Sequence, residues 1–282
     1  MTPPALAPPA LAPPALTRIG RLFLSLKREN RKGLIAYLTA GDPSPLRTPA
    51  LVAAMVRGGA DLIELGVPFS DPIADGPVIQ RAGERALKAG TTLATVLEIA
   101  RQIRATSEVP LLLFTYLNPV LRYGLERLAS DAAAAGIDGC LLTDASVEEA
   151  GTYVEAMHAR GLDTVFLAAP TSTARRIKLV AQYSTGFVYL VSRTGVTGEQ
   201  DSLSAAVGPL VQAVRAATGL PLAVGFGISK PAHVAELGRL VEAVVVGSAF
   251  VHLIERNADN PALETLLEAF TRELKSGFGA TV

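Results

Sequence analysis

Three carboxylates lie close together in the segment IELGVPFSDPIADGP, residues 63–77, of an otherwise largely apolar chain. Glu64 ends an apolar run, whereas Asp71 and Asp75 follow in a stretch that is rich in proline and glycine. Burial inside a strand raises the pKa of a carboxyl group, which suits a group that must both take and give a proton. Two carboxylates in different settings can hold different pKa values, so Glu64 and Asp75 could divide acid and base roles.

Each of these carboxylates also has a purely structural interpretation. Glu64 could pair with an arginine or with backbone donors, and Asp75 precedes a glycine in a common turn sequence. Asp71, which precedes Pro72, suits a residue that caps or braces the loop better than one that catalyses. The candidate acid–base pair is therefore Glu64 with Asp75.

Two glycine-rich segments form a second candidate site. The sequences GFGIS at 225–229 and GSA at 247–249 each follow an apolar run. Glycine lets a backbone approach an anion closely, and Ser248 could add a hydroxyl donor, so the pair predicts a phosphate site. The alternative is that both are only tight turns between strand and helix. No complete GxGxxG, GxxxxGK[ST] or GxSxG supports a dinucleotide, P-loop or hydrolase-elbow interpretation.

The elements that must position these residues follow a regular pattern. Eight short runs are continuously apolar, which indicates strands buried on both faces, as in a parallel sheet. They are residues 34–41, 61–68, 110–116, 139–144, 163–170, 186–192, 221–227 and 242–249. Amphipathic helical stretches lie between them, for example at 45–59, 92–106, 125–136 and 147–161. Gly59, Gly136 and Gly161 stand where such helices should end.

This alternation predicts an α/β fold, a (β/α)8 TIM barrel in one domain over residues 18–282, with an open doubly wound sheet as the alternative. In a barrel, the carboxyl ends of the strands form the face that carries the chemistry. Two longer connections, 68–92 and 193–202, follow the second and sixth predicted strands and are candidate lids.

The composition limits which binding partners and which cellular compartment we expect for this chain. Lys plus Arg and Asp plus Glu are both 26, so no net field favours nucleic acid or an anionic membrane surface, and no apolar run is long enough to span a bilayer. Cys140 has no partner, which suits a reducing, cytoplasmic setting, and with three dispersed histidines it gives no zinc spacing.

Residues 1–17 repeat a PPALA unit and predict an extended, low-complexity Pro/Ala tail. The tail has no basic n-region, so we do not interpret it as a signal peptide. A ligand for a proline-recognition domain is the alternative to a passive tail.

From about residue 18 to 275 the sequence resembles the alpha chain of tryptophan synthase. The motifs that carry the resemblance are AYLTAGDP (36–43), ELGVPFSDPIADGPVIQ (64–80), TYLNPV (115–120), YLVSRTGVTG (189–198), GFGIS (225–229) and VVVGSA (244–249). The resemblance implies a retro-aldol cleavage of indole-3-glycerol phosphate to indole and glyceraldehyde 3-phosphate, without a metal or an organic cofactor in this chain.

The resemblance also implies residue roles. Glu64 matches the glutamate that shuttles the proton to indole C3, Asp75 the carboxylate that engages the indole N–H, and Tyr189 a tyrosine near the reacting centre. Thr197 and Gly198 match a loop that closes over the site. The implied phosphate-binding positions are Gly198, Gly227, Gly247 and Ser248. The implied indole-pocket positions are Tyr37, Tyr116, Leu141 and Phe226.

The expected partner is a tryptophan synthase beta chain in an alpha2beta2 assembly, and the family places pyridoxal phosphate in that partner. One departure is Ser146, where the family usually has proline. Three alternatives stay open: a stand-alone lyase that releases free indole, a catalytically idle regulatory subunit, and a phosphate-binding barrel with another substrate. An aldolase of the last kind would require a Schiff-base lysine or metal ligands, and none of the eight runs contains lysine.

Overall fold

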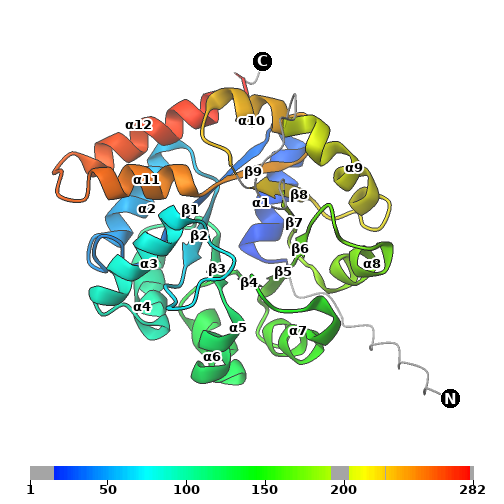
Figure 1. The fold of residues 1–282 in the computed structure, drawn as a ribbon, viewed down its shortest axis with the longest axis horizontal. Helices are drawn as coiled ribbons and strands as arrows, with labels where there is room; N and C mark the ends of the chain where they lie inside the picture. Colours follow the sequence, from blue (N-terminus) through cyan, green and yellow to red (C-terminus); the bar gives the residue numbers. More distant parts are fainter. Residues whose placement is uncertain (1–15, 192–202, 226, 280–282) are drawn as a thin grey trace.

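Nine parallel strands form one sheet in the part of the chain that the computed structural model describes, residues 16–191, 203–225 and 227–279. The strands are β1 (Gly33–Thr39), β2 (Leu62–Gly66), β3 (Leu111–Thr115), β4 (Gly139–Leu142), β5 (Asp163–Val165), β6 (Leu167–Ala168), β7 (Val188–Val191), β8 (Leu222–Gly225) and β9 (Ala243–Val246). Their order is β5-β4-β3-β2-β1-β9-β8-β7-β6, and helices ring them (Figure 1).

The fifth predicted strand is divided in two at Phe166. Its first half, β5, pairs with β4, and its second half, β6, pairs with β7. Since one residue separates the two edges of the sheet, the strands close into a barrel, and the N–H of Tyr189 donates to the Phe166 carbonyl at 3.1 Å across the join. The predicted TIM barrel is therefore confirmed, with one strand bent so that each half reaches its own neighbour.

Helices follow the strands as predicted. They are α1 (Arg18–Arg28), α2 (Thr48–Gly58), α3 (Pro77–Lys88), α4 (Leu93–Arg104), α5 (Leu117–Tyr123), α6 (Leu125–Ala134), α7 (Gly151–His158), α8 (Ala174–Tyr183), α9 (Leu203–Arg215), α10 (Pro231–Gly238), α11 (Ser248–Arg256) and α12 (Leu263–Ser276), with a short 3-10 helix at Val147–Glu149. Gly59, Gly136 and Gly161 adopt positive φ values of 106°, 79° and 71° just after helices, as their positions predict.

The long connection after β2 is only partly a loop. Its second half forms α3, which begins at Pro77, where a missing N–H costs no helical hydrogen bond. The segment that can act as a loop over the barrel is therefore 67–76. The other predicted lid, 193–202, lies outside the described residues.

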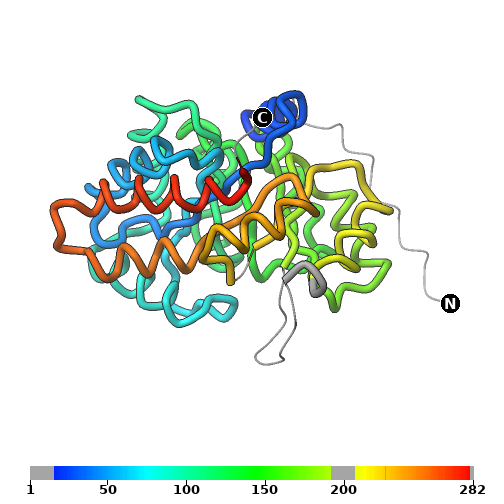
Figure 2. The backbone as a smooth tube through the Cα atoms, turned by 90° about the horizontal axis from the view of Figure 1, so that it is seen from above, coloured from blue at the N-terminus to red at the C-terminus, as the bar shows by residue number. Residues whose placement is uncertain are grey.

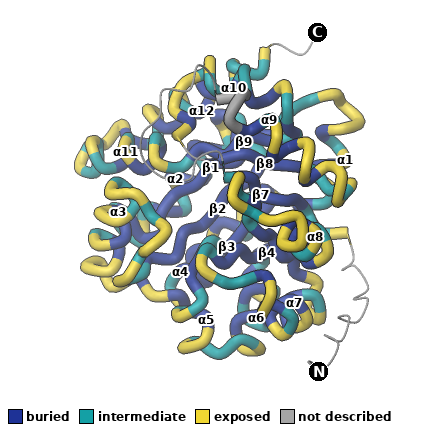
Figure 3. Tube along the Cα trace, turned by 45° about the vertical axis from the view of Figure 1, so that its right-hand side comes forward, coloured by how far each residue is buried: buried dark blue, intermediate teal, exposed yellow. Residues whose placement is uncertain are grey.

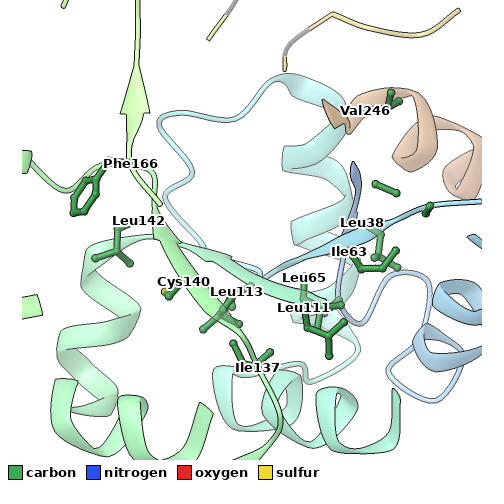
Figure 4. Close-up of a cluster of buried hydrophobic side chains, with 14 of the residues drawn as sticks. Leu38, Ile63, Leu65, Leu111, Leu113, Ile137, Cys140, Leu142, Phe166 and Val246 are labelled. Atoms are coloured by element: carbon green, nitrogen blue, oxygen red, sulfur yellow. The ribbon is translucent and has the colours of Figure 1, made fainter. Parts of the chain in front are cut away.

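Alternation along the strands separates two apolar cores. On β2, Ile63 and Leu65 face the surrounding helices and pack beside Leu111 and Leu113 of β3 (Figure 4), whereas Leu62 faces the barrel lumen. The strands lie buried at the centre, and exposed residues gather on the outer helices and loops (Figure 3).

Helix α1 closes one end of the lumen. Ile19, Phe23 and Leu26 pack against lumen-facing side chains of the strands, and the Phe23 and Phe187 rings lie 5.6 Å apart. Figure 2 shows α1 at one end of the barrel and the segment around α3 at the other. The lumen is therefore sealed at the amino ends of the strands. None of the helices in the described ranges combines the length and apolar character that crossing a bilayer requires.

We expect Gly58→Ala to lower the free energy of unfolding by at least ~1 kcal/mol, because a Cβ there would lie 2.6 Å from the Glu268 carbonyl of α12. A backbone carbonyl cannot rotate away, so α2 and α12 would have to separate. The matched control is Gly83→Ala in α3, whose nearest contact would be 3.9 Å and which should gain up to ~1 kcal/mol from helix propensity. Urea denaturation of both variants checks this, and a stabilised Gly58→Ala would contradict the packing described.

Candidate active site

A cavity of about 150 Å³ lies at the carboxyl ends of the strands. Its described lining comes from strands on all sides of the barrel and from the turns that follow them. The lining residues are Tyr37, Glu64, Ala74, Asp75, Gly76, Ile79, Phe114, Thr143, Leu167, Tyr189, Gly227, Ile228, Val245, Gly247 and Ser248. Glu64 and Asp75, separated in the sequence by a proline-rich loop, thus face one space.

Glu64 occupies the layer of the lumen directly above Leu62. Its side chain is 1% exposed, and its register partners are Tyr37 on β1 and Leu112 on β3. Within the described residues it forms no ion pair, and its Oε1 atom has no hydrogen-bond partner. Burial raises the pKa of Glu64 to about 8, so the carboxyl group is largely neutral at neutral pH. Of the two structural interpretations, pairing of Glu64 with an arginine therefore has no support among the described residues.

Asp75 reaches the same cavity from the loop. Its backbone N–H donates to the Pro72 carbonyl at 3.1 Å, and the Gln80 side chain donates to its carbonyl at 2.9 Å. Burial raises the pKa of Asp75 to about 6, while a hydrogen bond from Tyr116 opposes that rise. Near neutral pH the cavity therefore presents one neutral and one charged carboxyl group. Asp71 lies outside the cavity and accepts a hydrogen bond from Ser70 at 2.6 Å.

Two tyrosines flank Glu64 in the lumen. Tyr37 lies over Gly66 and Tyr189 over Gly225, where a Cβ on either glycine would overlap the tyrosine hydroxyl. Burial raises the pKa of both tyrosines, and the negative charges of nearby carboxylates raise it further. Both hydroxyls therefore stay protonated, and that of Tyr37 lies 3.4 Å from the Thr39 hydroxyl. The Phe114 ring packs edge-on against Tyr37, with centroids 5.2 Å apart, and adds an apolar wall.

The opposite part of the cavity suits an anion. Gly227 has a φ of 76°, and Gly247 caps α11 without any side-chain hydrogen bond to its first N–H groups. Those N–H groups and the Ser248 hydroxyl are donors at the positive end of a helix dipole. Since no lysine or arginine is among the described lining residues, a phosphate there would be bound chiefly by backbone donors.

An ion-pair network joins the two ends of the site. Arg85 of α3 bonds both oxygens of the buried Asp42 at 2.8 and 2.9 Å and also bonds Glu255 of α11 at 2.9 Å. Arg81 adds a two-point pair to Glu255. The helix that follows Asp75 is thereby fixed to α11, which begins at the candidate anion-binding turn.

The remaining predicted site residues have different locations. Leu141 lies in the lumen layer beneath the cavity, and Tyr116 lies behind Asp75 instead of in the described cavity wall. Thr197, Gly198 and Phe226 lie outside the described residues. Several lining residues are not among the site residues predicted from the sequence: Ala74, Gly76, Ile79, Phe114, Thr143, Leu167, Ile228 and Val245. The alternation of side chains between lumen and helix layer could have identified Phe114, Leu167 and Val245, because each lies two residues beyond a lumen-facing position on its strand.

Comparison with known proteins gives a consistent result. A family model described as tryptophan synthase alpha chain matches residues 23–278. The chain is 84% identical to a tryptophan synthase alpha chain from Solibacter usitatus over 94% of this chain and 99% of the relative. It is 49% identical to one from Geobacter sulfurreducens over 86% and 91%, respectively.

Solved structures agree with these matches. Tryptophan synthase subunit alpha from Legionella pneumophila superposes with a TM-score of 0.85 at 36% identity, covering 93% of this chain and 98% of that chain. A structure of Mycobacterium tuberculosis tryptophan synthase gives a TM-score of 0.85 at 38% identity, with the same coverages.

We expect Glu64→Gln to remove a pH dependence of stability. The folded chain keeps the Glu64 proton up to about pH 8, whereas the unfolded chain releases it near the ordinary pKa of 4.5. The resulting stabilisation is complete below that ordinary value and is lost as the pH rises through about 8. Relative to wild type, the free energy of unfolding of Glu64→Gln should therefore rise by at least ~1 kcal/mol from about pH 5 to about pH 8.

Urea denaturation at the two pH values measures this difference. The matched control is Glu155→Gln, a change at an exposed position of α7 away from the cavity, which should keep the wild-type pH dependence. If Glu64→Gln and wild type lost stability in parallel, Glu64 would not hold a proton in the folded chain.

Proposed function

The chain belongs to the tryptophan synthase alpha chain family, whose reaction is the cleavage of indole-3-glycerol phosphate, and we propose that Glu64 and Asp75 together perform that cleavage here. The observation that carries the proposal is the neutral carboxyl group of Glu64, whose Oε1 atom has no hydrogen-bond partner among the described residues and which faces the same cavity as the more acidic Asp75. The reaction is a retro-aldol step that yields indole and glyceraldehyde 3-phosphate.

The proton balance of the reaction fits one neutral carboxyl group. The bond between indole C3 and the adjacent glycerol carbon breaks, and its electron pair stays with the indole. C3 must therefore gain a proton, while the hydroxyl on the departing carbon loses one as it becomes an aldehyde. Glu64 can give the first proton and accept the second, so it ends the cycle in its starting state.

Asp75 supplies the complementary charge. Protonation at C3 places positive charge on the indole ring and its N–H, and an ionised carboxylate that accepts that N–H stabilises the charge. The reactive form of the site has Asp75 charged and Glu64 neutral, which is most populated between about pH 6 and about pH 8. Tyr189, held neutral beside Glu64, is proposed to donate to the substrate hydroxyls.

The substrate phosphate is assigned to the opposite end. Backbone N–H groups at Gly227 and Gly247 and the Ser248 hydroxyl would bind it. Gly247 and Ser248 lie at the start of α11, the helix that Arg85 holds through Glu255. Gly198 and Thr197 are proposed, by family resemblance, for the closing loop. Tyr37 and Phe226 are proposed for the indole pocket; Tyr37 lies beside the Phe114 ring. Leu141 would support that pocket from below, whereas Tyr116, which the resemblance also assigns to the indole pocket, lies behind Asp75 and does not line the described cavity.

The proposed partner is a tryptophan synthase beta chain, in an alpha2beta2 assembly that holds pyridoxal phosphate in the beta subunit and operates in the cytoplasm. Two exposed apolar side chains support a docking surface for this partner at the carboxyl ends of the strands. Ile73, in the loop between Glu64 and Asp75, is 83% exposed, and Leu121 of α5 is 61% exposed. A partner that covers Ile73 would act on the loop that carries Asp75.

We expect Glu64→Gln and Asp75→Asn each to lower the turnover of indole-3-glycerol phosphate by at least ~100-fold, because each removes a proton carrier or a charge from the reacting centre. The measurement is steady-state cleavage by the purified chain, with and without a beta chain. The wild-type rate should rise many-fold with the partner.

The matched control is Asp71→Asn, which changes an exposed carboxylate of the same loop outside the cavity and should leave cleavage by the isolated chain near the wild-type rate. Near-normal turnover of Glu64→Gln or Asp75→Asn would remove that residue from its proposed role. Fast cleavage by the chain alone, unchanged by a beta chain, would instead favour a stand-alone lyase.

A further inference from the structure

Tyr116 lies behind Asp75, between the end of β3 and the start of α5. Its side chain is 2% exposed, although it is not among the described residues that line the cavity. Tyr116 is the N-cap residue of α5, and its hydroxyl reaches the backbone of Ala74 in the loop 67–76. A buried tyrosine in this place contacts the catalytic loop without contacting the substrate cavity.

Tyr116 holds the loop at both ends. Its hydroxyl oxygen accepts a hydrogen bond from the backbone N–H of Ala74 at 3.1 Å. Its ring packs against Phe69, with centroids 5.2 Å apart. The loop that carries Asp75 is therefore bound to a residue outside the loop, which itself is fixed by β3 and α5.

Two side chains neighbour the Tyr116 hydroxyl as hydrogen-bonding partners, Asp75 and Thr143. Because the oxygen already accepts from Ala74, the single hydroxyl hydrogen is left to donate, and the Asp75 carboxylate is a stronger acceptor than the Thr143 hydroxyl, which itself donates to the Thr115 carbonyl at 3.3 Å. Burial and the charge of Asp75 raise the pKa of Tyr116, so the hydroxyl stays protonated. Such a donor stabilises the charged form of the carboxylate and restricts its orientation.

We propose that Tyr116 is a positioning residue for Asp75: it fixes the Ala74 backbone and donates its hydroxyl proton to the carboxylate, so that Asp75 faces the cavity as an anion. The inference rests on the role proposed above for Asp75. Tyr116 itself does not line the described cavity, and it acts through two residues that do, Ala74 and Asp75.

Few other groups can perform this task. The other titratable side chains that line the described cavity are Tyr37, Glu64 and Tyr189, and no lysine or arginine is among the described lining residues. Neither a cation nor a second carboxylate therefore orients Asp75 from the described cavity side, and the donor on its far side is Tyr116.

The test is Tyr116→Phe, which keeps the ring against Phe69 and removes only the hydroxyl. We expect kcat for indole-3-glycerol phosphate cleavage to fall by about 10-fold or more, with a much smaller change in KM. The rise of kcat/KM with pH that reports ionisation of Asp75 should move to higher pH, because a hydrogen bond to the charged form is lost.

The matched control is Tyr123→Phe. It removes a tyrosine hydroxyl that donates to Asp131 at 2.6 Å, and neither of these residues lines the described cavity. A double-mutant cycle with Asp75→Asn isolates the pairwise effect: if Tyr116 acts through Asp75, Tyr116→Phe should add little to Asp75→Asn.

The inference is overturned if Tyr116→Phe matches Tyr123→Phe in kcat and in the position of the pH limb. It is also overturned if Tyr116→Phe lowers turnover equally with and without the Asp75 carboxylate, as a merely structural role would. If Asp75→Asn alone cleaves at the wild-type rate, the proposed role of Asp75 is wrong, and the positioning role of Tyr116 falls with it. If Asp75→Asn is impaired but Tyr116→Phe is not, only the positioning role is wrong.

Discussion

Desolvation of one carboxyl group is the constraint on which this site depends. Glu64 projects into a lumen whose lower layers are apolar and whose floor is sealed by Ile19, Phe23 and Leu26 of α1. An ionised carboxylate there would cost several kcal/mol without a paired cation, and the described residues provide none. The group therefore keeps its proton, and an apolar barrel converts an ordinary glutamate into a proton source at neutral pH.

Other residues of the site supply the negative charge that burial removes from Glu64. A neutral Glu64 cannot stabilise positive charge on the substrate, so the proposed mechanism gives that task to Asp75, on a loop with more access to solvent. A loop needs external support to hold a charged group in place, and Tyr116 and the Arg85 network give it. Arg85 also connects α3 to the helix of the anion-binding turn, so the two ends of the substrate site share one rigid frame.

The sequence predicted what depends on local pattern. Continuous apolar runs revealed the strands, and a carboxylate within one of them marked Glu64 as unusual. The features that the sequence did not predict depend on contacts between residues far apart in the chain or on closure of the whole barrel. Tyr116 meets Ala74 across 42 residues, so its place behind Asp75 could not be inferred from either segment. The bend at Phe166 arises because one strand must pair with two neighbours, which only the closed barrel requires.

The most direct test of the account is the protonation state of Glu64 in the resting chain. Infrared difference spectra of protein with isotope-labelled glutamate, wild type against Glu64→Gln, would show whether a neutral carboxyl band belongs to this residue. The account predicts such a band at about pH 6 that disappears as the pH rises through about 8. A spectrum in which Glu64 is already ionised at about pH 6 would contradict the central claim.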